Sequence, residues 1–369
     1  MIIHESDNCE IHRFGKICVK SFKKQDIFRD ASMRFWDKTI GMNHVLPVLL
    51  RGENEIVYSY HDRVLIDNIS SLTPDQKMHI YKRVCETAYK LFQRNICHGD
   101  IIVTNIFIDS KNDPYLFDPF CTDIPINVPF HDSEDCYCLP SGSIHAGKEN
   151  KPCLKLLQRE LGLDLDPYEY ICSIIRDKIF ACSGSENYAD MKDQTYTSYE
   201  NKHFKLNGWR NTAERIAMFQ KDGVGIEGKK ILDIGSNCGA ISLYLAELGA
   251  KVTGIEINKD RVEVSTELNR FLGLDAEFKV GNLIDSVQNQ TYDICCCFAV
   301  TGRNPNEIGV LRKIYDHSTE ILFESNHSPN DDFTNMFKSI GYTTINHLGS
   351  TSGFPIRHSY HCSKTPKLS

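Results

Sequence analysis

One stretch with the residue types and spacing for ligand chemistry is a polar loop that contains two glycines. It consists of Asp233, Gly235, Ser236, Asn237 and Gly239, and it follows a short apolar run typical of a buried parallel strand. Glycine lets the backbone turn sharply and approach a ligand closely. The loop is therefore a candidate for binding part of a nucleotide-like molecule.

A carboxylate stands at a matching position one helix further along the chain. Glu256 ends a second apolar run, where an acidic side chain can accept hydrogen bonds from both hydroxyls of a ribose. The loop has the spacing D-x-G-x-x-x-G. Dinucleotide enzymes instead have G-x-G-x-x-G, whose glycines admit a pyrophosphate, so the spacing argues against NAD.

A second set of polar residues lies in the first half of the chain. His98-Gly99-Asp100 is followed by Asn105 after five residues and by Asp118 after thirteen more. Asp118 lies between two short strands, and Lys20 ends the second of two strands that Cys9 to Phe22 is predicted to form. These residues are candidates for a second, independent site.

The elements that must position these residues alternate between strand and helix. A helix with a Thr73-Pro74 start is expected over 73–93, and helices over 154–161 and 167–181 complete the first half. A lead-in and helix are expected over 196–220. The second half predicts strands at 231–234, 251–255, 276–280, 292–300 and 320–324, helices at 240–248, 261–272 and 333–340, and a closing antiparallel hairpin at 343–347 and 356–363.

From about Thr195 to Lys364 the sequence resembles class I S-adenosylmethionine-dependent methyltransferases. The resemblance implies an α/β, Rossmann-like domain with a seven-stranded sheet. It makes DIGSNCG the glycine loop for the cofactor, Glu256 the ribose carboxylate, and Asn282 the residue that contacts the adenine amino group. His327, in the loop after the fifth strand, is the best candidate for a catalytic base, although a surface histidine is the plainer interpretation.

From Met1 to about Leu163 the sequence resembles the protein-kinase-like fold in its small-molecule-kinase variant, which implies a compact α+β domain. On that resemblance Asp100 orients the acceptor hydroxyl, Asn105 and Asp118 hold Mg²⁺, and Lys20 contacts the phosphates of ATP. Two departures stand out. The presumed phosphate loop near residues 5–8 has no glycine, and Asp30 replaces the glutamate that pairs with the lysine.

Composition limits the functional classes. The 369 residues predict two domains, with a boundary near residue 190 (1–190 and 191–369). A net charge of −7 does not favour nucleic acid, although a local patch for tRNA stays open. The 15 cysteines and a polar N-terminus favour a reducing cytoplasm, with cysteine serving as a small apolar residue, and no apolar run reaches the length of a membrane span.

The pairing of the two halves resembles the bacterial kinase/methyltransferases that cap polysaccharide chains. It predicts a bifunctional enzyme that uses S-adenosylmethionine, ATP and Mg²⁺ on a saccharide-type or other small acceptor. Arg210 and Arg303 are expected to converge over the cofactor and bind a phosphate. Two alternatives stay open: a methyltransferase whose kinase-like half is an inactive recognition module for a glycan, a lipid-linked sugar or tRNA, and a non-enzymatic binding protein.

Overall fold

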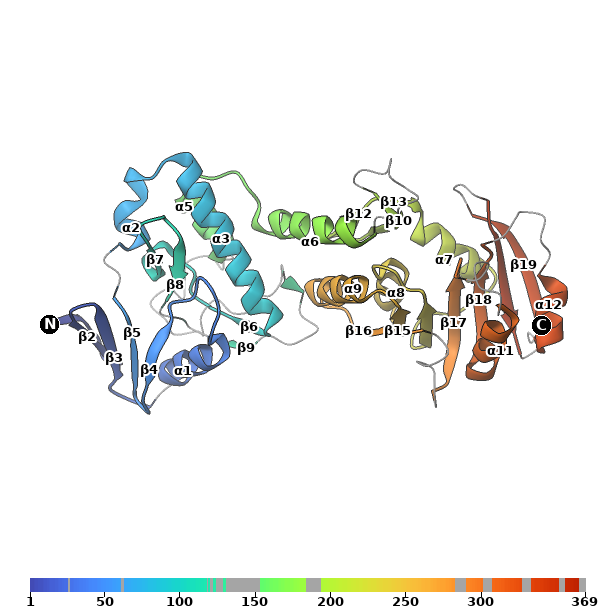
Figure 1. Ribbon diagram of the computed structural model, residues 1–369, viewed down its shortest axis with the longest axis horizontal. Coiled ribbons are helices and arrows are strands. Elements are labelled where there is room, and N and C mark those ends of the chain that lie inside the picture. The colour runs from blue at the N-terminus through green and yellow to red at the C-terminus, as the bar shows by residue number, and fades with distance from the viewer. Residues whose placement is uncertain are drawn as a thin grey trace. The chain divides into compact units, whose positions relative to one another are not determined.

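The computed structural model describes residues 1–25, 27–60, 63–117, 119, 122–123, 129–130, 153–183, 194–282, 290–300, 307–326, 333–351 and 356–364. The chain divides into two compact units, Met1–Ser173 and Ile174–Ser369 (Figure 1). This division falls within helix α6 (Pro167–Ser183). The boundary that we predicted near residue 190 lies outside the described residues and stays a prediction.

The first unit begins with an antiparallel sheet of five strands. Its order is β1 (Ile2–Glu5), β2 (Cys9–Phe14), β3 (Ile17–Phe22), β5 (Glu55–Ser59) and β4 (Val48–Arg51), and α1 (Ile27–Thr39) connects β3 to β4. The predicted hairpin is confirmed, because Phe14 pairs with Ile17 across a two-residue turn. Gly15 takes φ +61° in that turn, a conformation that favours glycine.

Helix α3 (Pro74–Gln93) is the longest element of the first unit, and its predicted start is confirmed. The Thr73 hydroxyl accepts from the Gln76 N–H, and the Gln76 side chain accepts in return from the Thr73 N–H. Other helical elements of this unit are α2 (Leu65–Asn68), the 3-10 turns η1 (Ile69–Ser71) and η2 (Val103–Asn105), and α5 (Cys153–Glu160). Two short antiparallel strand pairs accompany them: β6 (Ile96–Cys97) pairs with β9 (Thr122–Asp123), and β7 (Ile106–Ile108) pairs with β8 (Pro114–Leu116).

The second unit is built on a sheet of seven strands, as the sequence predicted. The order is β16 (Ala276–Val280), β15 (Lys251–Glu256), β14 (Lys230–Ile234), β17 (Tyr292–Phe298), β18 (Ser318–Glu324), β20 (His358–Ser363) and β19 (Thr344–Ser350). The first five strands are parallel and β20 is antiparallel to both neighbours, which confirms the closing hairpin. β17 ends two residues before its predicted end, since Ala299 turns to φ +62°.

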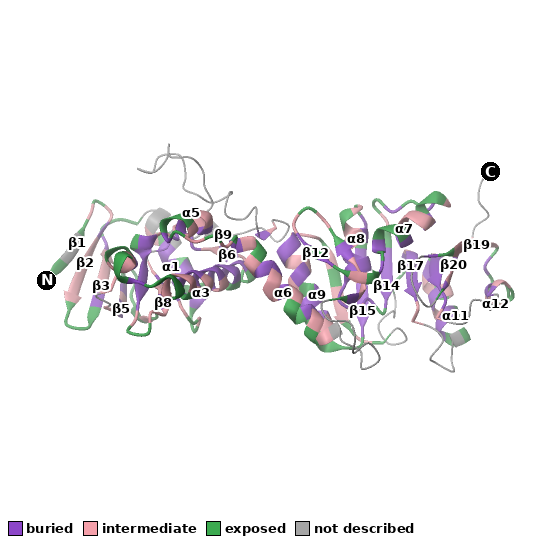
Figure 2. Ribbon diagram, turned by 90° about the horizontal axis from the view of Figure 1, so that it is seen from above, coloured by how far each residue is buried: buried purple, intermediate pink, exposed green. Residues whose placement is uncertain are grey.

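The described helices that lie wholly within this unit are α7 (Thr212–Lys221), α8 (Ala240–Glu247), α9 (Lys259–Leu272), α11 (Glu307–His317) and α12 (Thr334–Ile340). The inner strands are mostly buried (Figure 2), whereas the edge strands β16 and β19 are partly exposed. Successive residues of β17 join two different core clusters: Cys295 and Cys297 pack with residues of α11 and α12, and Cys296 packs with residues of α7 and α8. All three side chains are fully buried, which agrees with cysteine acting as a small apolar residue.

The segment before the sheet is more strand-like than the predicted lead-in. It forms a parallel pair, β10 (Thr195–Thr197) with β13 (Gly208–Arg210), and an antiparallel pair, β11 (Tyr199–Glu200) with β12 (Lys205–Leu206). Helix α7 starts only after Asn211, whose side chain accepts from the Glu214 N–H at 2.9 Å. The two short pairs bring polar and aromatic side chains to the carboxyl edge of the sheet, where the candidate site lies.

Candidate active site

The glycine loop between β14 and α8 is shaped by residues with positive φ. Gly235 has φ +69° and Gly239 has φ +84°, and Asn237 between them has φ +52°. A Cβ atom on Gly235 would lie 2.7 Å from Val300 Cγ2, and one on Gly239 would lie 2.8 Å from Ser265 Cβ. Both glycines are therefore required by conformation and by space, which explains the spacing seen in the sequence.

Glu256 lies beside this loop with its carboxylate held in place. Oε2 accepts from the Asn237 N–H and Oε1 accepts from the Asn258 N–H, each at 3.0 Å. Arg261 Nη1 lies 3.9 Å from Oε1, and only 6% of the Glu256 surface is exposed. Each oxygen has further capacity to accept, so the carboxylate is oriented to receive two hydroxyl donors.

Asp233, at the end of β14, is a buried carboxyl group behind the loop. Its Oδ2 accepts from the Ser242 hydroxyl at 2.6 Å. Burial raises the pKa of Asp233 to about 6, and the Ser242 hydrogen bond and the charge of Arg215 only partly oppose this effect. Asp233 thus carries a negative charge at neutral pH at an energetic cost, which a cationic ligand group would offset.

A cavity of about 340 Å³ brings these residues together. Asp233, the loop from Gly235 to Cys238, Glu256 and Arg261 line it, together with β10 and Trp209 of β13. Ser236 Oγ is buried in this wall and has no hydrogen-bond partner among the described residues. Asn282 is exposed and is not one of the described residues that line the cavity, so its role stays a prediction.

The cavity also has a wall of buried charges that the sequence did not identify as a group. Arg215 of α7 donates from Nε and Nη2 to the two oxygens of Glu324, at 3.0 and 3.1 Å. Arg357 Nη1 lies 3.7 Å from Glu324 Oε1, and the Thr351 hydroxyl donates to Oε2. A buried glutamate at the end of an apolar strand needs positively charged or hydrogen-bonding partners. The position of Glu324 at the end of β18 was the one feature of the local sequence that indicated such a cluster.

The carboxyl group of Asp233 gives a pH test of this burial. The unfolded chain releases the Asp233 proton near the usual value of 3.8, whereas the folded protein holds it to about pH 6. The free energy of unfolding should therefore fall as pH rises through this window, by on the order of 3 kcal/mol from this group. Urea unfolding of wild type and Asp233→Asn at pH 4 to 7 should show the variant gaining relative stability as pH rises. A constant difference would contradict the assigned burial.

The first unit brings together two of the residues predicted for its site. Asn105 Nδ2 donates to Asp100 Oδ2 at 2.7 Å and to the Asp100 carbonyl oxygen at 3.2 Å. Lys20 lies on β3 with its ammonium group 5.3 Å from the centre of the Phe22 ring, and Asp30 forms an ion pair with Arg29 at 2.8 Å. Asp100 and Asn105 are thus in direct contact, and their catalytic and metal-binding roles stay a prediction.

Three predicted residues, Asp118, His327 and Arg303, lie outside the described residues. Asn326, the residue before His327, lines the cavity. Within the described ranges, no group of three His, Cys, Asp or Glu side chains is arranged to hold a metal ion, and no helix there is both long and apolar enough to cross a membrane.

Comparison with known proteins finds a family match within the second unit. Residues 226–358 match a family model described as a methyltransferase domain, so the C-terminal region carries such a domain. Over 104 residues the chain is 30% identical to the ubiquinone biosynthesis O-methyltransferase of Actinobacillus pleuropneumoniae serotype 5b (strain L20), covering 27% of this chain and 44% of the relative. The chain thus spans less than half the length of this curated relative.

Two further similarities are weaker. The chain is 42% identical over 60 residues to the 23S rRNA (uracil(747)-C(5))-methyltransferase of Pyrococcus abyssi (strain GE5 / Orsay), covering 16% of this chain and 15% of the relative. Among solved structures, the bifunctional kinase-methyltransferase WbdD aligns with a TM-score of 0.35 and 19% identity, covering 42% of this chain and 39% of WbdD.

Proposed function

We propose that the second unit is an S-adenosylmethionine-dependent methyltransferase acting on a small, saccharide-type acceptor. The observation that carries the proposal is the Glu256 carboxylate, which two backbone N–H groups hold beside a loop opened by Gly235 and Gly239. The match of residues 226–358 to a methyltransferase domain supports it. The acceptor class rests on the sequence resemblance alone.

The described residues fit this cofactor. Glu256 accepts from the ribose hydroxyls, the backbone from Gly235 to Gly239 contacts the nucleoside, and Asn282 contacts the adenine amino group. The buried Asp233 carboxylate and the partnerless Ser236 hydroxyl suit a polar, cationic group in the cavity. When bound, the cofactor supplies a methyl group activated by its sulfonium.

Methyl transfer of this kind depends mainly on alignment of the acceptor. An acceptor oxygen that is already anionic needs no base, whereas a hydroxyl or amine acceptor needs one. His327 is the proposed base in the second case, because it follows Asn326, which lines the cavity.

Calorimetry of the full chain tests the proposal. We expect S-adenosylmethionine and S-adenosylhomocysteine to bind in a 1:1 ratio, and NAD to give no heat of binding because the loop lacks the dinucleotide spacing. Absence of binding for both sulfur nucleosides, in protein shown to be folded by circular dichroism, would remove the proposal.

We also propose that the first unit is an ATP-dependent phosphotransferase. Asp100 would orient the acceptor hydroxyl, Asn105 and Asp118 would hold Mg²⁺, and Lys20 would contact phosphates. The contact between Asn105 and Asp100 supports this assignment, since it fixes the amide beside the carboxylate. The bound ion would neutralise phosphate charge.

One observation favours the alternative, in which this unit only recognises the acceptor. In the turn between β1 and β2, the N–H groups of Asn8 and Cys9 donate to Ser6 Oγ at 3.3 and 3.2 Å. Those donors are satisfied within the turn, whereas phosphate loops direct backbone N–H groups at the ligand. The two hypotheses for the first unit differ in whether it turns over ATP in the presence of Mg²⁺.

We expect Asp118→Asn to eliminate Mg²⁺-dependent ATP turnover while leaving S-adenosylmethionine binding at its wild-type value. The two units have separate cores, so loss of one metal ligand should not reach the other site. ATP turnover by the full chain is measured with Mg²⁺ and with EDTA, alongside calorimetry with S-adenosylmethionine. If the wild-type protein showed no Mg²⁺-dependent ATP turnover, the phosphotransferase proposal would fail and the acceptor-recognition hypothesis would be favoured.

A further inference from the structure

The wall of buried charges contains one more guanidinium than its carboxylate can pair closely. Arg215 occupies both oxygens of Glu324 in a bidentate pair, which neutralises that carboxylate. Arg357 lies 3.7 Å from one of the same oxygens, which is beyond hydrogen-bond distance. Its side chain is nonetheless buried, with 5% of the residue surface exposed. A buried guanidinium that shares its carboxylate with a second arginine is only partly compensated, so a further anion would stabilise Arg357.

The hydrogen-bonding state of Arg357 points to a ligand. Its Nη1 donates to the Tyr196 hydroxyl, and the Tyr196 ring faces the guanidinium at 5.4 Å from its centre. Its Nε is buried and has no hydrogen-bond partner among the described residues. Arg357, Tyr196 and Arg215 all line the cavity. An oxyanion in the cavity would satisfy the donor and the surplus charge together.

The electrostatic surroundings agree with this interpretation. Burial lowers the pKa of Arg357, and the charges of Arg210 and Arg215 lower it further, whereas Tyr196 and Glu324 oppose this effect. Glu256 and Asp233 are the acidic side chains among the described residues that line the same cavity, and Arg261 lies beside Glu256. The cavity is therefore acidic toward the glycine loop and basic toward Arg357.

Strand order separates the two regions. Glu256 ends β15 and Glu324 ends β18, three strands away across β14 and β17. At a strand spacing of about 4.8 Å, these ends are roughly 14 Å apart. Arg357 directly precedes β20, next to the end of β18, since the Ser325 N–H donates to the His358 carbonyl. The basic region thus lies at the ends of β18 and β20, on the side of the glycine loop away from Glu256. A methyl acceptor could bind there next to the cofactor.

We infer that Arg357, held by Tyr196 and Glu324, binds an oxyanion of the methyl acceptor, a carboxylate or a phosphoryl group, next to the cofactor. This inference rests on the proposed methyltransferase function and narrows its acceptor to an anionic molecule. The expected pair of Arg210 and Arg303 stays a prediction. Arg210 is buried and donates to Thr351, and it is not one of the described residues that line the cavity; Arg303 lies outside the described residues.

The test is calorimetric titration of the full chain with phenyl phosphate and with benzoate, first without cofactor and then saturated with S-adenosylhomocysteine. We expect at least one of the two anions to bind, and to bind in the saturated protein too, because Arg357 lies next to the end of β18, roughly 14 Å across the sheet from the ribose carboxylate Glu256. Arg357→Gln should weaken anion binding about tenfold or more, the loss of a charged hydrogen bond, and change S-adenosylhomocysteine affinity less than twofold. Arg357→Lys should keep part of the anion affinity.

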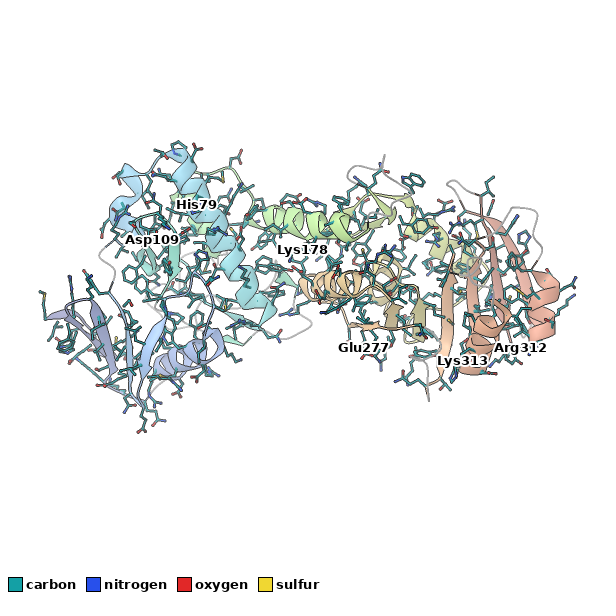
Figure 3. The ribbon with its side chains drawn as sticks, in the orientation of Figure 1. His79, Asp109, Lys178, Glu277, Arg312 and Lys313 are labelled. Carbon is teal, nitrogen blue, oxygen red and sulfur yellow. The ribbon has the colours of Figure 1, made fainter. Side chains whose placement is uncertain are left out.

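The control is Arg312→Gln, an exposed arginine on α11 (Figure 3), which should leave both affinities unchanged. Three results would overturn the inference: neither anion binding to either form, equal anion binding by wild type and Arg357→Gln, or displacement of the anion by S-adenosylhomocysteine with weaker nucleoside binding in Arg357→Gln. The last would assign Arg357 to the cofactor carboxylate. Failure of the nucleoside to bind at all would instead count against the proposed function, and the cofactor-free titration would still decide whether Arg357 binds an anion.

Discussion

Replacing Glu256 by alanine should abolish tight binding of S-adenosylmethionine. The variant removes the charged acceptor for two ribose hydroxyls, which costs about 1.5–3 kcal/mol or more, or at least a tenfold loss of affinity. It also leaves the N–H groups of Asn237 and Asn258 without their acceptor, so the loop itself loses a constraint. Glu256→Gln should be nearly as damaging, because one oxygen becomes an NH₂ group that faces a backbone donor.

The measurement is calorimetric titration of wild type and both variants, with circular dichroism to establish folding. A matched control is Glu277→Ala, which removes an exposed glutamate from the adjacent strand β16 (Figure 3) and breaks only its ion pair with Lys279. Exposed pairs of this kind contribute little, so affinity should not change. Wild-type affinity in Glu256→Ala would end the ribose assignment.

Local sequence signals were sufficient for the parts of the site that are close together in the chain. Asp233, the two glycines and Glu256 fall within one strand, loop, helix and strand, and their spacing alone determined which strand ends they occupy. Strands that contain a buried apolar run, such as β14 and β17, were also predictable from local sequence. The ends of the elements were less predictable than their presence. The strand predicted to end at residue 347 continues as β19 to Ser350 through an irregularity near Gly349, which has φ +94°.

The charged wall could not be predicted in the same way, because its members are far apart in sequence. Arg215 and Glu324 are 109 residues apart, and Arg357 follows a further 33 residues after Glu324. Arg215 lies on helix α7, and the local sequence there does not indicate which of the charged side chains is buried. Only the order of strands brings β18 and β20 together and places both next to α7 residues. Pairing of buried charges is thus a tertiary property here.

The pairing of Arg215 with Glu324 leads to the last prediction, which concerns stability. Arg215→Met should lower the free energy of unfolding by roughly 3–5 kcal/mol, because it leaves Glu324, with 1% of its surface exposed, without its bidentate partner. Arg357 remains 3.7 Å away and offsets part of the loss. Glu324→Gln should cost at least as much, since it leaves two buried guanidiniums, Arg215 and Arg357, with no carboxylate between them.

Urea unfolding of the full chain, followed by circular dichroism and by tryptophan fluorescence, measures these losses. Trp209 belongs to the second unit and Trp36 to the first, so the two units can be followed separately if they unfold in two steps. The control is Lys178→Met on α6, which breaks an ion pair with Glu267 of α9 at 2.7 Å but at a half-exposed lysine (Figure 3), and should cost less than about 1 kcal/mol. If Glu324→Gln unfolded at the wild-type urea concentration, the carboxylate would not be holding these arginines. If it were destabilised and added phenyl phosphate restored part of the loss, the same arginines would be shown to accept an external anion in place of Glu324.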